Sequence, residues 1–234
     1  MRVHVALTPA SSWSASIAVV VDVLRATSTI AQALASGYER VYCCAEIDEA
    51  RALRERLGEG LLGGERNAVL IEGFDVGASP REFVGEPRAR SVVFSTTNGT
   101  RTILQAAAQA DQVLLGSLLN LEAVARAARE SGEDVALICA GFQGEFALDD
   151  AYCAGRIVQL IGGEPSDAAK ACDAVARAWP DAHEALLART YGPPGLEEDI
   201  AYCAQVSLLE VVPQLERMRD GAAEIMARAV DSGA

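Results

Sequence analysis

The chain has 234 residues, enough for one sizeable α/β domain to bury its core, and its six cysteines lack the CxxC spacing of a zinc or redox site. The formal net charge of −13 argues against a general nucleic-acid binder, and a single lysine, Lys170, disfavours Schiff-base chemistry and a Walker-type phosphate site. No apolar run reaches the roughly 18 residues of a membrane span, so we expect a cytoplasmic protein without a membrane partner.

Apolar runs alternate with amphipathic segments over the first two-thirds of the chain, a pattern typical of βαβ units in a mainly parallel sheet. The predicted strands are 2–7, 16–23, 40–44, 60–65, 91–96, 112–116 and 134–141. The helices predicted among them are 27–36, 47–57, 99–109 and 120–131. From about 147 to 234 the pattern is helical throughout, with helices at 147–162, 166–178, 181–189 and 197–229. The last of these either covers the sheet or contacts a second copy of the chain, which leaves a homo-oligomer open.

Two segments of the chain resemble each other. When "VVVDVLRATSTIAQALASGYERVYCC" is aligned with "VVFSTTNGTRTILQAAAQADQVLLGS", Thr29 falls opposite Thr102, 73 residues later. Each copy reads strand, polar turn, helix, strand, helix, strand. This pattern predicts an internal duplication, about 16–66 and 90–145, within a single α/β domain spanning 1–234. Generic βαβ patterning is the alternative explanation.

The first copy carries polar residues where its first strand ends. Asp22 follows the apolar run, Arg25 lies in the turn, and Thr27 or Ser28 is placed to cap the next helix. Ligands of parallel α/β sheets bind beyond the carboxyl ends of the strands, where helix N-termini point. We therefore expect a ligand site here. The alternative is that Thr27 only caps the helix and Arg25 only pairs with Asp22.

The equivalent turn of the second copy is rich in hydrogen-bond donors. Its residues "STTNGT" lead into a helix, and Gly99 allows close backbone approach. The backbone N–H groups of Thr96, Thr97, Asn98 and Thr100, together with the threonine hydroxyls, are expected to bind a phosphate or sulfonate. An ordinary Ser/Thr/Asn turn is the alternative.

Further carboxylates follow two other strands. Glu65 and Arg66 come after a pair of glycines, and Asp149 and Asp150 lie near the start of a helix, where the helix dipole also favours acidic residues. Carboxylate oxygens without a histidine cluster suit Mg²⁺ rather than Zn²⁺. Cys139, at a strand end, is either a buried structural thiol or a nucleophile.

The segments "DVLRATSTI", "GGER", "FSTTNGTR", "CAGFQGEFALDDAYCAG" and "LLEVVP", in this order and spacing, together resemble the 2-phosphosulfolactate phosphatase family. The resemblance implies a three-layer α/β/α fold and a Mg²⁺-dependent phosphatase that acts on a small anionic phosphorylated substrate, in a step of coenzyme M biosynthesis. The chain departs from the expected pattern at Phe142, where a hydroxyl residue is expected. The positions that fall in the family's motifs are Asp22, Arg25, Thr27, Ser28, Glu65, Arg66, Thr97, Asn98, Gly99, Thr100 and Asp150.

These observations predict hydrolysis of a phosphate monoester. Asp22, Glu65 and Asp150 would hold Mg²⁺, Arg25 and Arg66 would neutralise phosphoryl charge, and the "TTNGT" turn would bind the substrate. Direct attack by water and a phosphoenzyme on Asp22 or Cys139 both remain open. A non-catalytic small-anion sensor and an acidic interaction protein are the alternative functions.

Overall fold

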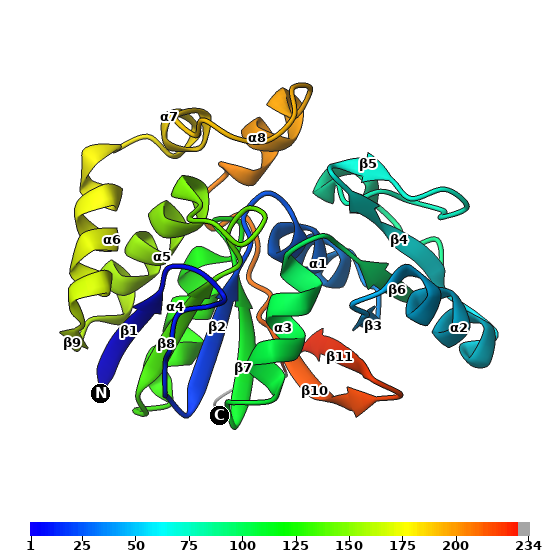
Figure 1. The fold of residues 1–234 in the computed structure, drawn as a ribbon, viewed down its shortest axis with the longest axis horizontal. Helices are drawn as coiled ribbons and strands as arrows, with labels where there is room; N and C mark the ends of the chain where they lie inside the picture. Colours follow the sequence, from blue (N-terminus) through cyan, green and yellow to red (C-terminus); the bar gives the residue numbers. More distant parts are fainter. Residues whose placement is uncertain (229–234) are drawn as a thin grey trace.

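The computed structural model describes residues 1–228, in which a single large sheet is covered by helices (Figure 1). The first part of the chain contains β1 (Arg2–Ala6), β2 (Ile17–Val21), α1 (Ala26–Ala35), β3 (Arg40–Cys43), α2 (Ile47–Leu57), β4 (Leu61–Arg66), β5 (Val69–Leu70) and the 3-10 helix η1 (Pro80–Phe83). The middle contains β6 (Ser91–Ser95), α3 (Gly99–Ala107), β7 (Gln112–Gly116), α4 (Leu121–Glu130), β8 (Val135–Cys139) and α5 (Leu148–Ile161). The rest contains β9 (Glu164–Pro165), α6 (Asp167–Ala178), α7 (Ala182–Leu187), α8 (Glu197–Cys203), β10 (Pro213–Arg219) and β11 (Ala222–Ala227).

The strand order of the sheet is β5-β4-β6-β3-β11-β10-β7-β2-β8-β1-β9. Strands β4, β6 and β3 form one parallel group, and β7, β2, β8, β1 and β9 form another. The β10–β11 hairpin lies between them and pairs antiparallel with β7 on one side and β3 on the other. The predicted mainly parallel α/β sheet is confirmed, and all seven predicted strands are present.

The C-terminal part of the chain differs from the prediction. Within the described residues the helix predicted over 197–229 is wrong, because α8 ends at Cys203 and the chain then enters the hairpin at the centre of the sheet. The end of the predicted helical part, 229–234, lies outside the described residues. Asp220 and Gly221 both have positive φ, 50° and 84°, which suits the tight turn of a two-residue hairpin. The apolar residues of β11, such as Ala223 and Ile225, are buried in the core as part of a strand and not of a helix.

The two faces of the sheet are covered by different helices, as alternate residues of β2 show. Val19 and Val21 belong to the core cluster that contains buried residues of α4 and α5, whereas Ala18 and Val20 belong to the cluster of α1 and α3. A third cluster joins Leu53 of α2 to the far half of the sheet. Successive strand residues point to opposite faces, so this division confirms the three-layer α/β/α architecture.

The strand order is symmetric about the hairpin. Reading outward from it, one side runs β3, β6, β4 and the other β7, β2, β8. The first strand of each resembling segment thus lies between the second and third strands of the other segment. This order is compatible with the duplication, which stays a prediction.

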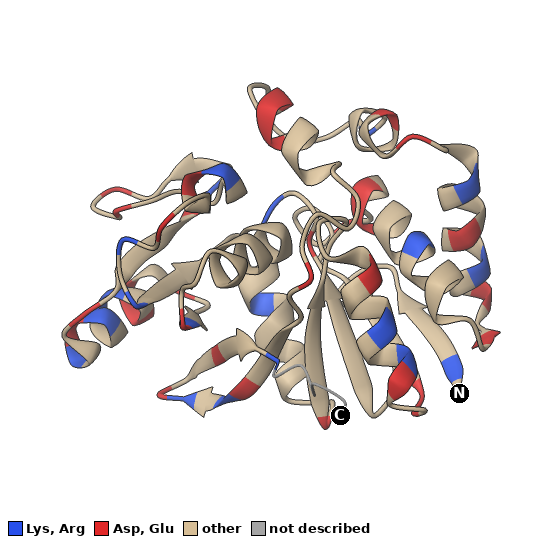
Figure 2. Cartoon of the chain, turned by 180° about the vertical axis from the view of Figure 1, so that it is seen from behind, with Lys and Arg blue, Asp and Glu red and all other residues tan. Residues whose placement is uncertain are grey.

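Lys and Arg are interspersed with Asp and Glu on the outer helices and on the hairpin (Figure 2). Within residues 1–228, no helix has both the length and the apolar composition needed to cross a bilayer.

Candidate active site

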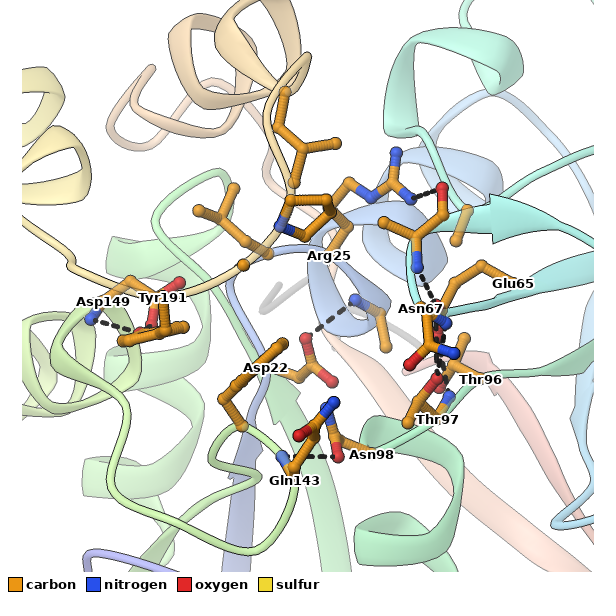
Figure 3. A pocket seen from close by; sticks show the side chains of 18 of the residues that line it. Asp22, Arg25, Glu65, Asn67, Thr96, Thr97, Asn98, Gln143, Asp149 and Tyr191 are labelled. Carbon is orange, nitrogen blue, oxygen red and sulfur yellow. Dashed lines mark hydrogen bonds between the residues drawn. The ribbon is translucent and has the colours of Figure 1, made fainter.

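A pocket lies where β2, β4 and β6 end and is also lined by the segment that joins α7 to α8. Figure 1 shows where these elements lie. Its lining brings together residues that are far apart in the sequence, and Asp22 lies between two walls that carry Glu65 on one side and Asp149 on the other (Figure 3). The charged and polar side chains of the lining are Asp22, Arg25, Glu65, Asn67, Thr96, Thr97, Asn98, Gln143, Asp149, Arg189 and Tyr191.

Asp22 follows β2 directly and is almost completely buried. Its Oδ1 accepts a hydrogen bond from the N–H of Ala26, at 3.1 Å. Burial raises the pKa of Asp22 to about 7, and the charges of Asp149 and Glu65 act in the same direction, against the Ala26 N–H and Arg25. Asp22 is therefore a carboxyl group in a pocket crowded with like charge, a setting that a bound cation would relieve.

The N-terminal ends of α1 and α3 meet at Asp22. A Cβ atom placed on Gly99 would lie 2.4 Å from the Cβ of Ala26 and 2.5 Å from Oδ2 of Asp22, so only glycine allows this approach. Helix N-termini carry partial positive charge and unpaired N–H groups. β2 and β6, the first strands of the two segments, belong to parallel groups that run in opposite directions. Their carboxyl ends nevertheless meet, because the helices that follow them, α1 and α3, pack on the same face of the sheet.

Three of the hydroxyl residues predicted to bind substrate are buried and lie outside the pocket lining. The hydroxyl of Thr27 donates to the carbonyl oxygen of Gly116 at 2.7 Å and accepts from the Asp22 N–H at 3.0 Å. Ser28 donates to the carbonyl oxygen of Val23, and the Thr100 hydroxyl accepts from the N–H of Thr96. In this structure these hydroxyls hold the two turns in shape, and their contacts with a substrate stay a prediction.

Glu65 and Thr97 join the ends of β4 and β6. Oε1 of Glu65 accepts from the N–H of Thr97 at 2.7 Å, and Oε2 accepts from the N–H of Ala68 at 2.6 Å. Arg66 points to the opposite side of β4, because side chains alternate along a strand, and donates to the hydroxyl of Ser95 at 2.9 Å. Arg66 lines a separate surface groove and not this pocket, and its catalytic role stays a prediction.

Asp149, rather than Asp150, faces the pocket. The two carboxylate oxygens of Asp150 accept from the N–H groups of Val23 and Gly141, both at 2.9 Å, and tie the loops after β2 and β8 together. Both oxygens of Asp150 are thus occupied by backbone donors, and its role as a metal ligand stays a prediction. Asp149 accepts from the Tyr191 hydroxyl through Oδ1, and burial raises its pKa.

Arg25 lines the pocket but does not pair with Asp22. Its Nη1 donates to Oδ2 of Asp199 in α8 at 2.6 Å, and Asp199 also accepts from the hydroxyl of Ser79. Arg25 thus connects the turn after β2 to α8 and η1. Because Arg25 already pairs with Asp199, its positive charge is less available to bind an anion of the substrate.

Several lining residues were missed by the sequence prediction. Asn67, Arg189 and Tyr191 carry no motif that marks them, because each lies in a loop without periodicity. Gln143 lies within the segment "CAGFQGEFALDDAYCAG" but was not among the predicted site residues. Gln143 has a φ of 54° and donates its N–H to the side chain of Asn98 at 3.3 Å. Phe142, where the family pattern leads us to expect a hydroxyl residue, stacks on Tyr191 with ring centroids 5.1 Å apart.

Cys139 is fully buried in the core and lies outside the pocket lining. Burial raises the pKa of its thiol well above the ordinary value, so the reactive thiolate is disfavoured. Of the two interpretations of Cys139, the structure favours the structural thiol.

The donor set of the pocket fits Mg²⁺ bound partly by a substrate. Within residues 1–228, no three acidic, His or Cys side chains are arranged to hold a metal by themselves. Magnesium, however, commonly takes one or two carboxylates and completes its shell with water and phosphate oxygens. Oδ2 of Asp22 and Oδ2 of Asp149 accept no hydrogen bond from the described residues, and both side chains line the pocket.

The fold and the site define a three-layer α/β/α protein whose pocket, at the strand ends and two helix N-termini, suits a small anion and a hard cation. Comparison with known proteins gives the family. The family model for 2-phosphosulpholactate phosphatase matches residues 3–218. A Thermus thermophilus protein named probable 2-phosphosulfolactate phosphatase is 42% identical, over 98% of this chain and all of its own length.

Two further relatives carry the same name. A Carboxydothermus hydrogenoformans protein is 40% identical over 84% of each chain, and a Deinococcus radiodurans protein is 38% identical over 92% of this chain and 93% of its own. The chain therefore belongs to the 2-phosphosulpholactate phosphatase family and is a phosphoric monoester hydrolase.

Proposed function

We propose that this chain is a Mg²⁺-dependent phosphatase that hydrolyses 2-phosphosulfolactate to sulfolactate and phosphate. The observation that carries the proposal is the position of Asp22, buried between the N-termini of α1 and α3 and facing Glu65 and Asp149. Family membership supports the substrate, because relatives along nearly the whole chain are named for it.

In this proposal Asp22 and Glu65 hold Mg²⁺, and Asp149 takes the place of Asp150. Glu65 keeps lone pairs for the metal beyond those that accept from Thr97 and Ala68. When bound, Mg²⁺ would supply positive charge against the phosphoryl oxygens. The pocket would otherwise repel a phosphorylated substrate, because three carboxylates line it.

The residues of the chain bind and orient the phosphoryl group. In this proposal the phosphoryl group binds at the positive N-terminal end of α3, where the side chain of Asn98 can donate a hydrogen bond to it. The Thr97 hydroxyl donates to Oε2 of Glu65 at 3.2 Å and so holds that carboxylate in place. The segment from α7 to α8 lines the pocket with Arg189, Tyr191 and Leu196, and in this proposal it restricts the access of water. Catalysis is then mainly positioning and electrostatic stabilisation, as phosphoryl transfer allows.

The test is release of phosphate from 2-phosphosulfolactate. We expect turnover with Mg²⁺, loss of turnover with EDTA, and a fall in kcat of at least about 100-fold in Asp22→Asn. Asp173→Asn, a partly exposed carboxylate on α6 outside the pocket lining, serves as the matched control. Binding of the substrate without release of phosphate would favour the non-catalytic sensor instead.

Two routes for the attacking group are separated by a labelling experiment. Turnover of ³²P-labelled substrate followed by acid quenching leaves label on the protein if Asp22 forms a phosphoenzyme. Absence of label in the wild type during turnover indicates direct attack by water.

A further inference from the structure

Two arginines line the pocket, and only one of them is engaged with a carboxylate. Arg25 forms its ion pair with Asp199 at 2.6 Å. Arg189, from the segment between α7 and α8, has no carboxylate oxygen within ion-pair distance among residues 1–228. The charge of Arg189 lowers the pKa of Asp149 from a distance, but no direct ion pair occupies it, so its guanidinium can still pair with a ligand.

One nitrogen of the Arg189 guanidinium has a hydrogen-bond partner, and others have none among the described residues. Its Nη1 donates to the carbonyl oxygen of Tyr191 at 2.6 Å. Its Nε is buried and has no hydrogen-bond partner within the described part of the chain. Because this Nε has almost no accessible surface, a ligand would meet the guanidinium at its outer edge. Nη2 donates to none of the described residues, and Nη1 keeps one N–H beyond the bond to Tyr191, so these two nitrogens can donate two hydrogen bonds to an oxyanion.

The segment that carries Arg189 is attached to the rim of the pocket. Its guanidinium carbon lies 5.9 Å from the ring centroid of Tyr191, and that ring stacks on Phe142. The Tyr191 hydroxyl donates to Asp149, another lining residue. These contacts hold Arg189 beside the wall of the pocket that carries Asp149. Glu65 and Thr97 lie on the other side of Asp22.

A phosphorylated sulfo-hydroxy acid carries two oxyanions besides its phosphoryl group, a carboxylate and a sulfonate. The α3 N-terminus and Asn98 are assigned to the phosphoryl group, so the other oxyanions need a cation elsewhere. We propose that Arg189 is a specificity residue that binds the carboxylate or sulfonate of the substrate through a bidentate contact. This inference rests on the proposed function and adds the residue that selects a second anionic group.

The test compares three phosphate esters: 2-phosphosulfolactate, 2-phospholactate, which lacks the sulfonate, and 2-sulfoethyl phosphate, which lacks the carboxylate. With 2-phosphosulfolactate we expect Arg189→Ala to lower kcat/KM about 10- to 100-fold, mainly through KM, as loss of a charged hydrogen bond implies. Arg189→Lys, which keeps the charge but not the fork, should lose less.

The substrate dependence decides the outcome. A penalty that disappears with 2-sulfoethyl phosphate assigns Arg189 to the carboxylate, and one that disappears with 2-phospholactate assigns it to the sulfonate. An equal penalty with all three esters overturns the proposal, because Arg189 would then act on the phosphoryl group or on the fold. Arg177→Ala, an exposed arginine on α6, is the control and should behave as wild type.

Binding of sulfolactate, measured by calorimetry, separates this inference from the proposed function. A wild type that binds sulfolactate but releases no phosphate refutes the phosphatase proposal, and weaker binding by Arg189→Ala would still support the inference. Equal affinity of the two proteins overturns the inference whatever the activity. Near-UV circular dichroism confirms that each variant is folded.

Discussion

Replacement of Gly99 by alanine tests whether the contact between α1 and α3 builds the site. The added Cβ would lie 2.4 Å from the Cβ of Ala26 and 2.5 Å from Oδ2 of Asp22. Carbon atoms pack at about 3.5–4.0 Å, so α3 must move by about 1 Å or more. Alanine gains about 1 kcal/mol in helix propensity, but overpacking costs about 1–3 kcal/mol, so the net effect is mild destabilisation. A displacement of about 1 Å at reacting groups can lower activity about 100-fold.

The assay is phosphate release by Gly99→Ala, together with urea denaturation to determine its free energy of unfolding. Gly155→Ala is the matched control, because its Cβ would lie 2.0 Å from the carbonyl oxygen of Cys172, where α5 packs on α6. The control should lose stability but keep the kcat of the folded protein. Wild-type kcat/KM in fully folded Gly99→Ala would refute the claim that this close approach is required.

Three further predictions concern buried groups near the site. Because burial raises the native pKa of Asp22 to about 7 from 3.8, Asp22 stabilises the metal-free fold less as pH rises between these values. The stability of Asp22→Asn relative to wild type in EDTA should therefore increase from pH 4 to pH 7 in urea denaturation, and a flat difference would contradict this. Asp150→Asn should destabilise the fold by about 1–3 kcal/mol through a lost backbone acceptor and leave Mg²⁺ affinity, measured by calorimetry, unchanged. Cys139→Ala should keep wild-type kcat for phosphate release, and its inactivation in a folded protein would restore the nucleophile hypothesis.

The sequence predicts most of the sheet because the strands carry continuous apolar runs. The residues of β2 and β8 are buried on both faces, which is what such runs indicate. The β10–β11 hairpin was missed because Ala, Leu and Glu favour helices. The pair Asp220–Gly221 is nevertheless typical of a hairpin turn. Burial of β11 in the core outweighs the helix propensity of its residues.

The site was predicted in outline but not in its side-chain directions. Asp22, Glu65, Thr97 and Asn98 meet in one pocket, as strand ends and helix starts imply. The alternation of side chains along β4 would have separated Glu65 from Arg66.

The choice between Asp149 and Asp150 depends on how α5 is rotated against the sheet, which sequence alone does not define. Arg189 and Tyr191 reach the pocket through tertiary contacts of a loop more than 160 residues from Asp22.

The position of the hairpin also affects how the sheet forms while the protein is being synthesised. No strand of the β4-β6-β3 group pairs with a strand of the β7-β2-β8 group within residues 1–228; only β10 and β11 connect them. A ribosome-bound chain that has not yet released residues 213–227 therefore has two separate half-sheets, with the edges of β3 and β7 unpaired. Such edges invite pairing with other chains, so we expect the nascent protein to be more prone to aggregation before β10 and β11 emerge than after.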